Sequence, residues 1–259
     1  MTDAFYIPDG DRYVATEHTR GPWSPKHQHG GPPAALIAHA VEALAPELTI
    51  ARMTVDFLRP VPIDRLAVRV ETLRAGAKVQ RLIGTLLHGD AVVAHAVVTL
   101  VRATAVDVPA PVIAAIIAPP EIARPFRFPF FREPLGYHTA MESRLALGHF
   151  GRGRVAIWMR QRMPLIAGTA PSPIERVLVA ADSGSGVSAG IEQASHTAIN
   201  FDLTVALHRP LHGEWVGLDS ISTYEPTGLG LADTRVLDVR GTIGRALQGL
   251  VIERRPAAP

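Results

Sequence analysis

The sequence contains no cysteine, and this absence excludes several classes of protein. A disulfide framework, a cysteine-ligated zinc or iron–sulfur cluster and a thiolate nucleophile all need that side chain. The chain has 26 basic and 24 acidic residues, and the resulting net charge of +2 is too small to indicate a nucleic-acid partner. The spacing of His27 and His29 without a neighbouring carboxylate is a poor metal signal, so we expect no metal site.

Long apolar runs are also missing, and no secretory signal is expected. No uninterrupted stretch of about 18 apolar residues occurs, so no membrane-spanning helix is predicted. The first ten residues carry two aspartates and no basic segment, unlike a secretory signal. A chain of 259 residues that is 47% hydrophobic and 19% charged can still bury a substantial core. We expect a cytoplasmic protein with one large domain or two of about 125 residues.

A weak internal repeat is present at an offset of 150 residues. Residues 53–60 (MTVDFLRP) resemble residues 203–210 (LTVALHRP), with Thr, Val, Arg and Pro in common. The apolar pattern of residues 95–101 also agrees with that of residues 245–251 at the same offset. Two copies of one structural unit are therefore predicted.

Each half is predicted to hold a helix followed by four antiparallel strands, with two further extended segments before the second helix. Apolar residues at helical spacing indicate a helix at Pro32–Leu44, and His88-Gly89-Asp90 is typical of a hairpin turn. The second helix is expected at Pro173–Gly190, although three glycines weaken it. The predicted strands are Ile50–Val61, Leu66–Leu73, Val79–Leu87, Ala91–Val101, Arg144–Leu147, Arg154–Met163, Ala198–His208, Trp215–Tyr224, Leu229–Val239 and Gly244–Glu253.

Between the halves, residues 106–134 are rich in proline, which interrupts helices and sheets. We interpret this segment as a linker between an N-terminal domain of residues 1–105 and a C-terminal domain of residues 135–259. Its centre, residues 124–132, interleaves phenylalanine with arginine (RPFRFPFFR). We expect these phenylalanines to pack on the core and the arginines to face water, rather than a nucleic acid or a membrane.

Short motifs in both halves carry a resemblance to a known family. His29-Gly30-Gly31 opens the first predicted helix, and Phe57-Leu58-Arg59-Pro60 closes the next strand. Ala181-Asp182-Ser183 lies where the second helix is expected to start, and Asn200-Phe201-Asp202 and Leu247-Gln248-Gly249 follow in later strands. In order and spacing these motifs resemble the acyl-CoA thioesterase II family over almost the whole chain.

The resemblance implies an α+β protein with a double hotdog fold, in which two tandem antiparallel sheets each wrap around a central helix. It also implies hydrolysis of acyl-CoA-like thioesters to a free acid and CoA by an activated water, with no cofactor. The family holds that water with an aspartate, a hydroxyl residue and a glutamine, which fall on Asp182, Asn200 and Gln248. Asn200 thus replaces the hydroxyl residue. The acyl chain is expected in an apolar tunnel between the halves.

The residues themselves support this assignment in part. A carboxylate near a helix start is favoured by the helix dipole and can act as a general base, although Asp182 also fits a plain helix cap. Gln248 interrupts an apolar strand and marks a polar site if it is buried, but not if it faces outward. At the offset of 150 residues, the counterparts of the three polar residues are all apolar: Pro32, Ile50 and Val98. We therefore predict one active site per chain.

The start of the first helix is expected to complete this site. Glycine at positions 30 and 31 lets backbone N–H groups approach a carbonyl oxygen and form an oxyanion hole, unless the pair is only a loop before the helix. His29 is a candidate for substrate binding. His27 and His29 are weaker candidates for acid–base groups, because a lone loop histidine is commonly solvated.

Two other functions stay open on the sequence. The change of the hydroxyl residue to Asn200 also fits a non-catalytic protein that binds acyl-CoA or an acyl chain. A hotdog enoyl-CoA hydratase needs an Asp-x-Asn-x-x-His run, which is absent, and Asp202 and His208 lie about 20 Å apart along one strand. The run Gly184-Ser185-Gly186 lacks the full serine-hydrolase elbow, and residues 228–230 lack the helix start of a dinucleotide site. Exposed outer strands make a homo-oligomer plausible.

Overall fold

The computed structural model describes residues 3–108, 117–192 and 195–255, and in both halves a helical segment is followed by antiparallel strands. In the first half, α1 (Gly31–Leu44) precedes β3 (Thr49–Phe57), β4 (Arg65–Arg74), β5 (Val79–His88) and β6 (Ala91–Val101). In the second half, α3 (Pro173–Ala181) and α4 (Gly184–Val187) precede β10 (His196–Asn200), β11 (Asp202–Leu207), β12 (Val216–Tyr224), β13 (Leu229–Asp238) and β14 (Gly241–Arg254).

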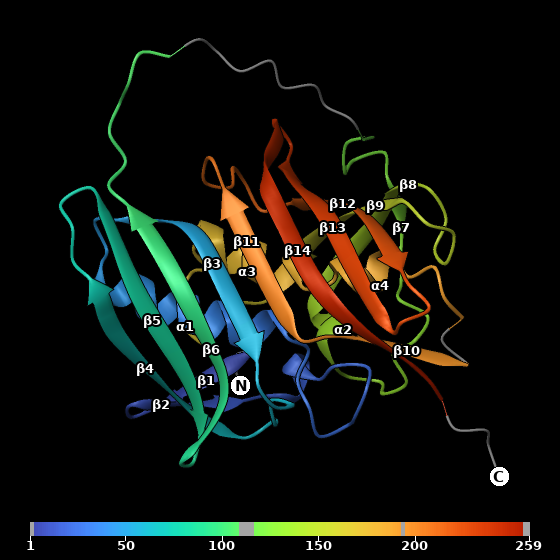
Figure 1. Cartoon of the computed structure of the whole chain (residues 1–259), viewed down its shortest axis with the longest axis horizontal. Coiled ribbons are helices and arrows are strands. Elements are labelled where there is room, and N and C mark those ends of the chain that lie inside the picture. The colour runs from blue at the N-terminus through green and yellow to red at the C-terminus, as the bar shows by residue number, and fades with distance from the viewer. Residues whose placement is uncertain (1–2, 109–116, 193–194, 256–259) are drawn as a thin grey trace.

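The strands of the two halves join edge to edge. Pairing of β3 with β11 makes a continuous sheet of 14 strands within the described residues, and this sheet curves around α1 and α3 (Figure 1). The outer strands are β1 (Tyr6–Asp9), β2 (Arg12–Ala15), β7 (Arg124–Pro125), β8 (Met141–Leu147) and β9 (Val155–Gln161). The double hotdog is confirmed, with the two expected sheets fused into one. In the part of the chain that is described, no helix is long and apolar enough to cross a membrane.

The offset of 150 residues is confirmed for the strands. Thr54 of β3 lies opposite Thr204 of β11, and the two hydroxyl oxygens are 3.2 Å apart. Residues that differ by the repeat length therefore meet at the junction, as they must on a pseudo-twofold axis. The counterpart strands match equally well, since β5 and β13 begin and end at residues that differ by the same 150.

A bulge at the same place in both halves also follows the repeat. Asn200 pairs with Leu250 as Ile50 pairs with Leu100, and in each half the register then shifts by one residue. In the second half this shift separates β10 from β11 at Phe201, so the single strand predicted over Ala198–His208 is wrong at this point. A bulge changes which side chains face inward, and here it directs position 200 toward the interior.

The prediction of one helix over Pro173–Gly190 is wrong. Ser172 caps α3 by accepting a hydrogen bond from the Glu175 N–H, but the helix ends at Ala181 and α4 is a separate single turn. Glycine at positions 184 and 186 lowers the helical propensity there. The helices consequently do not keep the offset of the strands. Asp182 lies at the C-cap of α3 rather than near a helix start, and Pro32 is not its counterpart.

The two central helices touch closely where α1 begins. A side-chain carbon placed on Gly31 lies only 2.3 Å from the backbone carbonyl oxygen of Val179 in α3. Only glycine permits this approach, because a neighbouring backbone atom cannot move aside as a side chain can. The contact fixes the start of α1 against the last turn of α3, which carries Asp182.

A polar cluster joins the other end of α1 to the start of α3. His39 Nδ1 lies 2.8 Å from the buried carboxylate of Glu175, and the Ser172 hydroxyl donates to Glu42 at 2.6 Å. The edge of the Tyr13 ring from β2 also meets His39. The hydrogen bond to Glu175 is the main cause that raises the pKa of His39, and the negative charge of Glu42 acts in the same direction.

This cluster predicts a pH-dependent contribution to stability. A raised folded-state pKa means that protonated His39 stabilises the fold below its ordinary pKa of 6.5, and the contribution is lost as pH rises through the raised value. We expect His39→Gln to lower the melting temperature more at about pH 5.5 than at about pH 9. His88→Gln, which removes an exposed pair with Asp64, is the control and should change little at either pH. An equal loss at both pH values for His39→Gln contradicts the prediction.

Candidate active site

A cavity of about 440 Å³ lies between the two halves of the chain. Its lining includes His29 and Gly30 from the loop before α1, Asp182 from the end of α3, and Asn200 from β10. Aromatic side chains from the segment before α2 (Tyr137–Ala140) form another part of the lining. Residues that lie far apart in the sequence are thus brought to one apolar cavity with a small polar group, which is typical of a ligand site.

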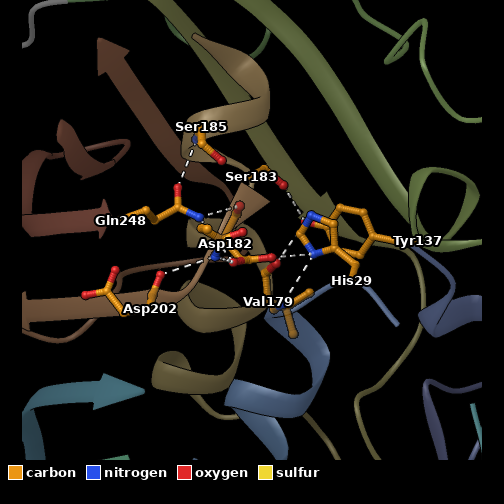
Figure 2. Close-up of polar contacts among 10 residues, drawn as sticks. His29, Tyr137, Val179, Asp182, Ser183, Ser185, Asp202 and Gln248 are labelled. Atoms are coloured by element: carbon orange, nitrogen blue, oxygen red, sulfur yellow. Dashed lines mark hydrogen bonds and ion pairs between the residues drawn. The ribbon is translucent and has the colours of Figure 1, made fainter. Parts of the chain in front are cut away.

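Asp182 is the buried carboxylate of this cavity, with 6% of its surface exposed. Its Oδ1 accepts hydrogen bonds from Asn200 Nδ2 at 2.8 Å and from Gln248 Nε2 at 3.2 Å. Its Oδ2 lies 3.1 Å from His29 Nδ1 (Figure 2). The end of its own helix disfavours a negative charge, so these three neighbours replace the stabilisation that was expected from a helix start.

The helix start that does approach Asp182 belongs to α1. A side-chain carbon on Gly30, the N-cap of that helix, lies 2.9 Å and 3.0 Å from the two carboxylate oxygens. Glycine at this position therefore lets the carboxylate approach the positive end of a 14-residue helix. The sequence predicts that a helix start stabilises the Asp182 carboxylate. The start of α1 lies in that position, whereas α3, the helix that carries Asp182, presents its C-terminal end.

Gln248 of β14 is 1% exposed and holds Asp182 in place. Its Nε2 donates to both the backbone carbonyl and the carboxylate of Asp182, and its Oε1 accepts the Ser185 N–H at 2.9 Å (Figure 2). The buried alternative for this residue is confirmed, and the outward-facing one is wrong. Because both amide hydrogens are used on Asp182 and the side chain does not line the cavity, Gln248 orients the carboxylate.

Asn200 lies at the end of β10, where the bulge turns its side chain inward. Its Nδ2 donates to Asp182 and to the Asp202 carbonyl oxygen, while its Oδ1 accepts no hydrogen bond from the described residues. The counterparts in the first half, Ile50 and Val98, are 3% and 0% exposed and apolar. The same two interior positions therefore carry amides in one half and hydrocarbon in the other.

The His29 side chain is only 11% exposed, which contradicts the expectation of a solvated loop histidine. Its ring stacks on Tyr137 of α2 at a centroid distance of 3.8 Å and an interplanar angle of 2° (Figure 2). The Tyr137 hydroxyl donates to the Val179 carbonyl oxygen at 2.8 Å, and Ser183 lies 2.9 Å from the same hydroxyl. Burial lowers the pKa of His29, against a smaller opposing effect of Asp182.

The two glycines before α1 differ in what they do. Gly30 lines the cavity, and its N–H has no hydrogen-bond partner among the residues that the structure describes. The Gly31 N–H instead donates to His29 Nδ1 at 3.2 Å. A free backbone N–H that faces a cavity can stabilise a developing oxyanion.

Several residues of the site escaped the sequence interpretation. Tyr137, Ser183 and Ser185 are joined to the polar network, and Phe128, Phe130 and Phe131 line the cavity. These phenylalanines face inward while Arg124, Arg127 and Arg132 are exposed, as expected for the segment. No sequence pattern marks a single tyrosine as part of a site. The run of phenylalanines was recognised in the sequence, but the sequence did not show that it lines this cavity.

A double hotdog with a buried carboxylate in a cavity between its halves has the architecture of an enzyme that acts on acyl thioesters, and the family models show which class of enzyme it is. The family model described as the acyl-CoA thioesterase N-terminal domain matches residues 19–105. The model of the acyl-CoA thioesterase C-terminal domain matches residues 114–252. The chain therefore belongs to the acyl-CoA thioesterase family, and hydrolysis of acyl-CoA thioesters is its activity.

Solved structures agree with this fold at low sequence identity. A candidate thioesterase from Novosphingobium aromaticivorans is 18% identical with a TM-score of 0.79, over 95% of this chain and 98% of the other. Acyl-CoA thioesterase II from Mycobacterium marinum is 14% identical with a TM-score of 0.67, over 96% of each chain. A hotdog protein of unknown function from Alicyclobacillus acidocaldarius is 15% identical with a TM-score of 0.75, over 98% and 96%. No curated protein sequence matches the chain significantly.

Asp202 and His208, the pair considered for a hydratase in the sequence, do not line the cavity. Asp202 accepts the Gly249 N–H at 2.5 Å and so serves the bulge of the sheet. No hydrogen bond joins Ser183 or Ser185 to a histidine in the described part of the chain, so neither of these two serines has an activating base there.

Proposed function

We propose that Asp182 is the general base of the thioesterase and that each chain has one active site, in the cavity between its halves. The observation that carries this proposal is the arrangement of the carboxylate. Two amides donate to its Oδ1, whereas His29 Nδ1 is the only polar side-chain group of the described residues within hydrogen-bond distance of its Oδ2. A carboxylate that is held on one side and open on the other is suited to binding a water and accepting its proton.

The proposed reaction follows from these positions. A water donates to Asp182 and to the free Oδ1 of Asn200, and its oxygen attacks the thioester carbonyl carbon as Asp182 takes the proton. The Gly30 N–H stabilises the oxyanion of the tetrahedral intermediate. Collapse breaks the carbon–sulfur bond, and the proton held by Asp182 passes to the departing sulfur. Acyl-CoA and water thus give a carboxylic acid and CoA thiol, with no net change at the protein.

The other site residues act by positioning. Gln248 fixes the rotamer of Asp182 through both amide hydrogens, and Tyr137 fixes the ring plane of His29. Burial lowers the pKa of His29 and so favours the neutral ring, in which an unprotonated Nδ1 can accept the Gly31 N–H. A neutral imidazole leaves Asp182 free to act as the base, whereas a protonated one forms an ion pair with it.

This role of His29 predicts an acid limit on turnover. The pKa of His29 is lowered from 6.5 by burial, so the neutral ring predominates at pH 6.5 and the protonated ring forms as pH falls through the lowered pKa. We expect kcat to reach its plateau at neutral pH and to fall as pH decreases through that pKa. In His29→Gln, whose amide oxygen can still accept the Gly31 N–H, the fall should be weaker. The check is kcat against pH for both proteins, and identical profiles contradict the prediction.

Thiol release from acyl-CoAs of graded chain length tests the proposed function. Release of CoA by the wild-type protein is expected for at least one member of the series. Tight binding of every ester without release would instead indicate an acyl-CoA binding protein of the same fold.

We further propose that the chain acts in the cytoplasm in lipid metabolism, where acyl-CoA esters are formed and consumed. The domain limits at residues 1–105 and 135–259 are also kept as a proposal. The end of the N-terminal family model at residue 105 supports the first limit, whereas the C-terminal model already begins at residue 114. Assembly into a homo-oligomer stays a prediction, which sedimentation of the purified protein tests.

A further inference from the structure

The aromatic residues of this chain are few and concentrate at one place. Aromatic side chains make up 6% of the sequence, and eight of them are phenylalanine. Five of these phenylalanines line the cavity described above: Phe57, Phe128, Phe130, Phe131 and Phe201. The rest of the core is built mainly from aliphatic side chains, which could equally fill this space. The concentration therefore points to contact with a ligand.

Three of these rings form one side of the cavity and are named here the aromatic wall: Phe128, Phe130 and Phe131. They come from a single segment between β7 and α2. The Phe130 and Phe131 rings are inclined by 24° at a centroid distance of 5.4 Å, and Phe131 is inclined to Tyr137 by 24° at 6.3 Å. Tyr137 in turn stacks on His29. A series of nearly parallel rings thus leads from the wall to the residue beside Asp182.

The wall also contacts α4. A side-chain carbon placed on Gly186 lies 3.3 Å from Cζ of Phe130, so the ring packs against the helix backbone. Phe128 behind it is 6% exposed and packs against Phe130 and Phe131. The wall is thus held between α4 and its own segment, and a flat group bound on this side of the cavity would lie against the rings.

We propose that the aromatic wall selects acyl-CoA substrates whose acyl group carries an aromatic ring, such as arylacetyl-CoA, over straight-chain esters. This inference rests on the proposed site at Asp182, because the wall acts on the acyl group of the ester bound there. An aryl group gains offset or edge contacts with Phe130 and Phe131. It also has fewer internal rotations to lose on binding than an alkyl chain with the same number of carbons.

The first experiment compares kcat/KM for phenylacetyl-CoA and octanoyl-CoA, which have the same number of acyl carbons. The wild-type protein should favour phenylacetyl-CoA by about tenfold, and Phe130→Leu should bring the ratio close to one. Phe126→Leu is the matched control, since Phe126 belongs to the same segment but does not line the cavity. A wild-type preference for octanoyl-CoA, or a ratio unchanged in Phe130→Leu, overturns the proposal.

A binding measurement separates this proposal from the proposed mechanism. In Asp182→Asn, Kd for the two intact esters is measured without relying on turnover. Tighter binding of phenylacetyl-CoA supports the proposed role of the aromatic wall, whether or not the wild-type protein hydrolyses the two esters. A lack of hydrolysis by the wild-type protein would count against the mechanism alone. Equal or weaker binding of phenylacetyl-CoA overturns the proposal that the aromatic wall selects aryl groups, and it leaves the proposed mechanism of hydrolysis unaffected. Cyclohexylacetyl-CoA, which has a ring but no π face, should bind less tightly than phenylacetyl-CoA.

Discussion

Replacing Asp182 with asparagine is expected to lower kcat for acyl-CoA hydrolysis by about 10²–10⁴-fold. The amide has nearly the same size as the carboxylate, and its oxygen can still accept the hydrogen bonds from Asn200 and Gln248. It cannot take a proton from water. The loss should therefore appear in kcat, with KM changed little, because the lining of the cavity is preserved. Thiol release under saturating substrate measures it.

Asp56→Asn provides the matched control for that substitution. Asp56 lies on β3 outside the cavity and pairs with His95 at 3.3 Å, with about half of its side chain exposed. The same chemical change at this position should leave turnover within about twofold of wild type, since an exposed pair contributes little. Wild-type turnover in Asp182→Asn, or an equal loss in the two variants, would mean that another group activates the water.

The second large effect is expected for Gly31→Ala, which should destabilise the fold by about 3 kcal/mol. The added methyl group would stand 2.3 Å from the Val179 carbonyl oxygen, so α1 and α3 must separate. That carbonyl oxygen also accepts the Tyr137 hydroxyl, and Asp182 lies in the following turn. The substitution is therefore expected to lower turnover as well as stability. Chemical denaturation measures the first effect and thiol release the second.

Gly190→Ala separates this close contact from the general effect of removing a glycine. A side-chain carbon on Gly190 lies 3.5 Å from the Tyr224 ring, which is an ordinary van der Waals distance. We expect a change in the free energy of unfolding of less than about 1 kcal/mol for this variant. A Gly31→Ala protein as stable as Gly190→Ala would show that the two helices can move apart without cost.

The strands and the buried amides could be predicted from the sequence because both follow the repeat. The pattern of β5 reappears in β13 after 150 residues, and the interior positions of Ile50 and Val98 reappear as Asn200 and Gln248. An internal copy provides a reference for each position, so a polar residue in place of an apolar one stands out. The family resemblance then named the chemistry that such residues carry.

The surroundings of Asp182 could not be predicted in this way because the helices depart from the repeat. Local propensity ends α3 at Ala181, and tertiary packing then brings the start of α1 to the carboxylate. The burial of His29 depends on Tyr137, which is more than 100 residues away in the chain. Contacts of this kind arise from the packing of separate segments, so the local sequence pattern of either segment does not predict them.

A crystal structure of Asp182→Asn with an intact acyl-CoA bound tests the central claim most directly. The mechanism predicts that the thioester carbonyl lies in the cavity with its oxygen on the Gly30 N–H. A water should stand about 3–3.5 Å from the carbonyl carbon, held by the substituted side chain and by Asn200. A thioester bound away from Gly30, or one that leaves no space for a water next to position 182, would contradict the assignment of Asp182 as the general base.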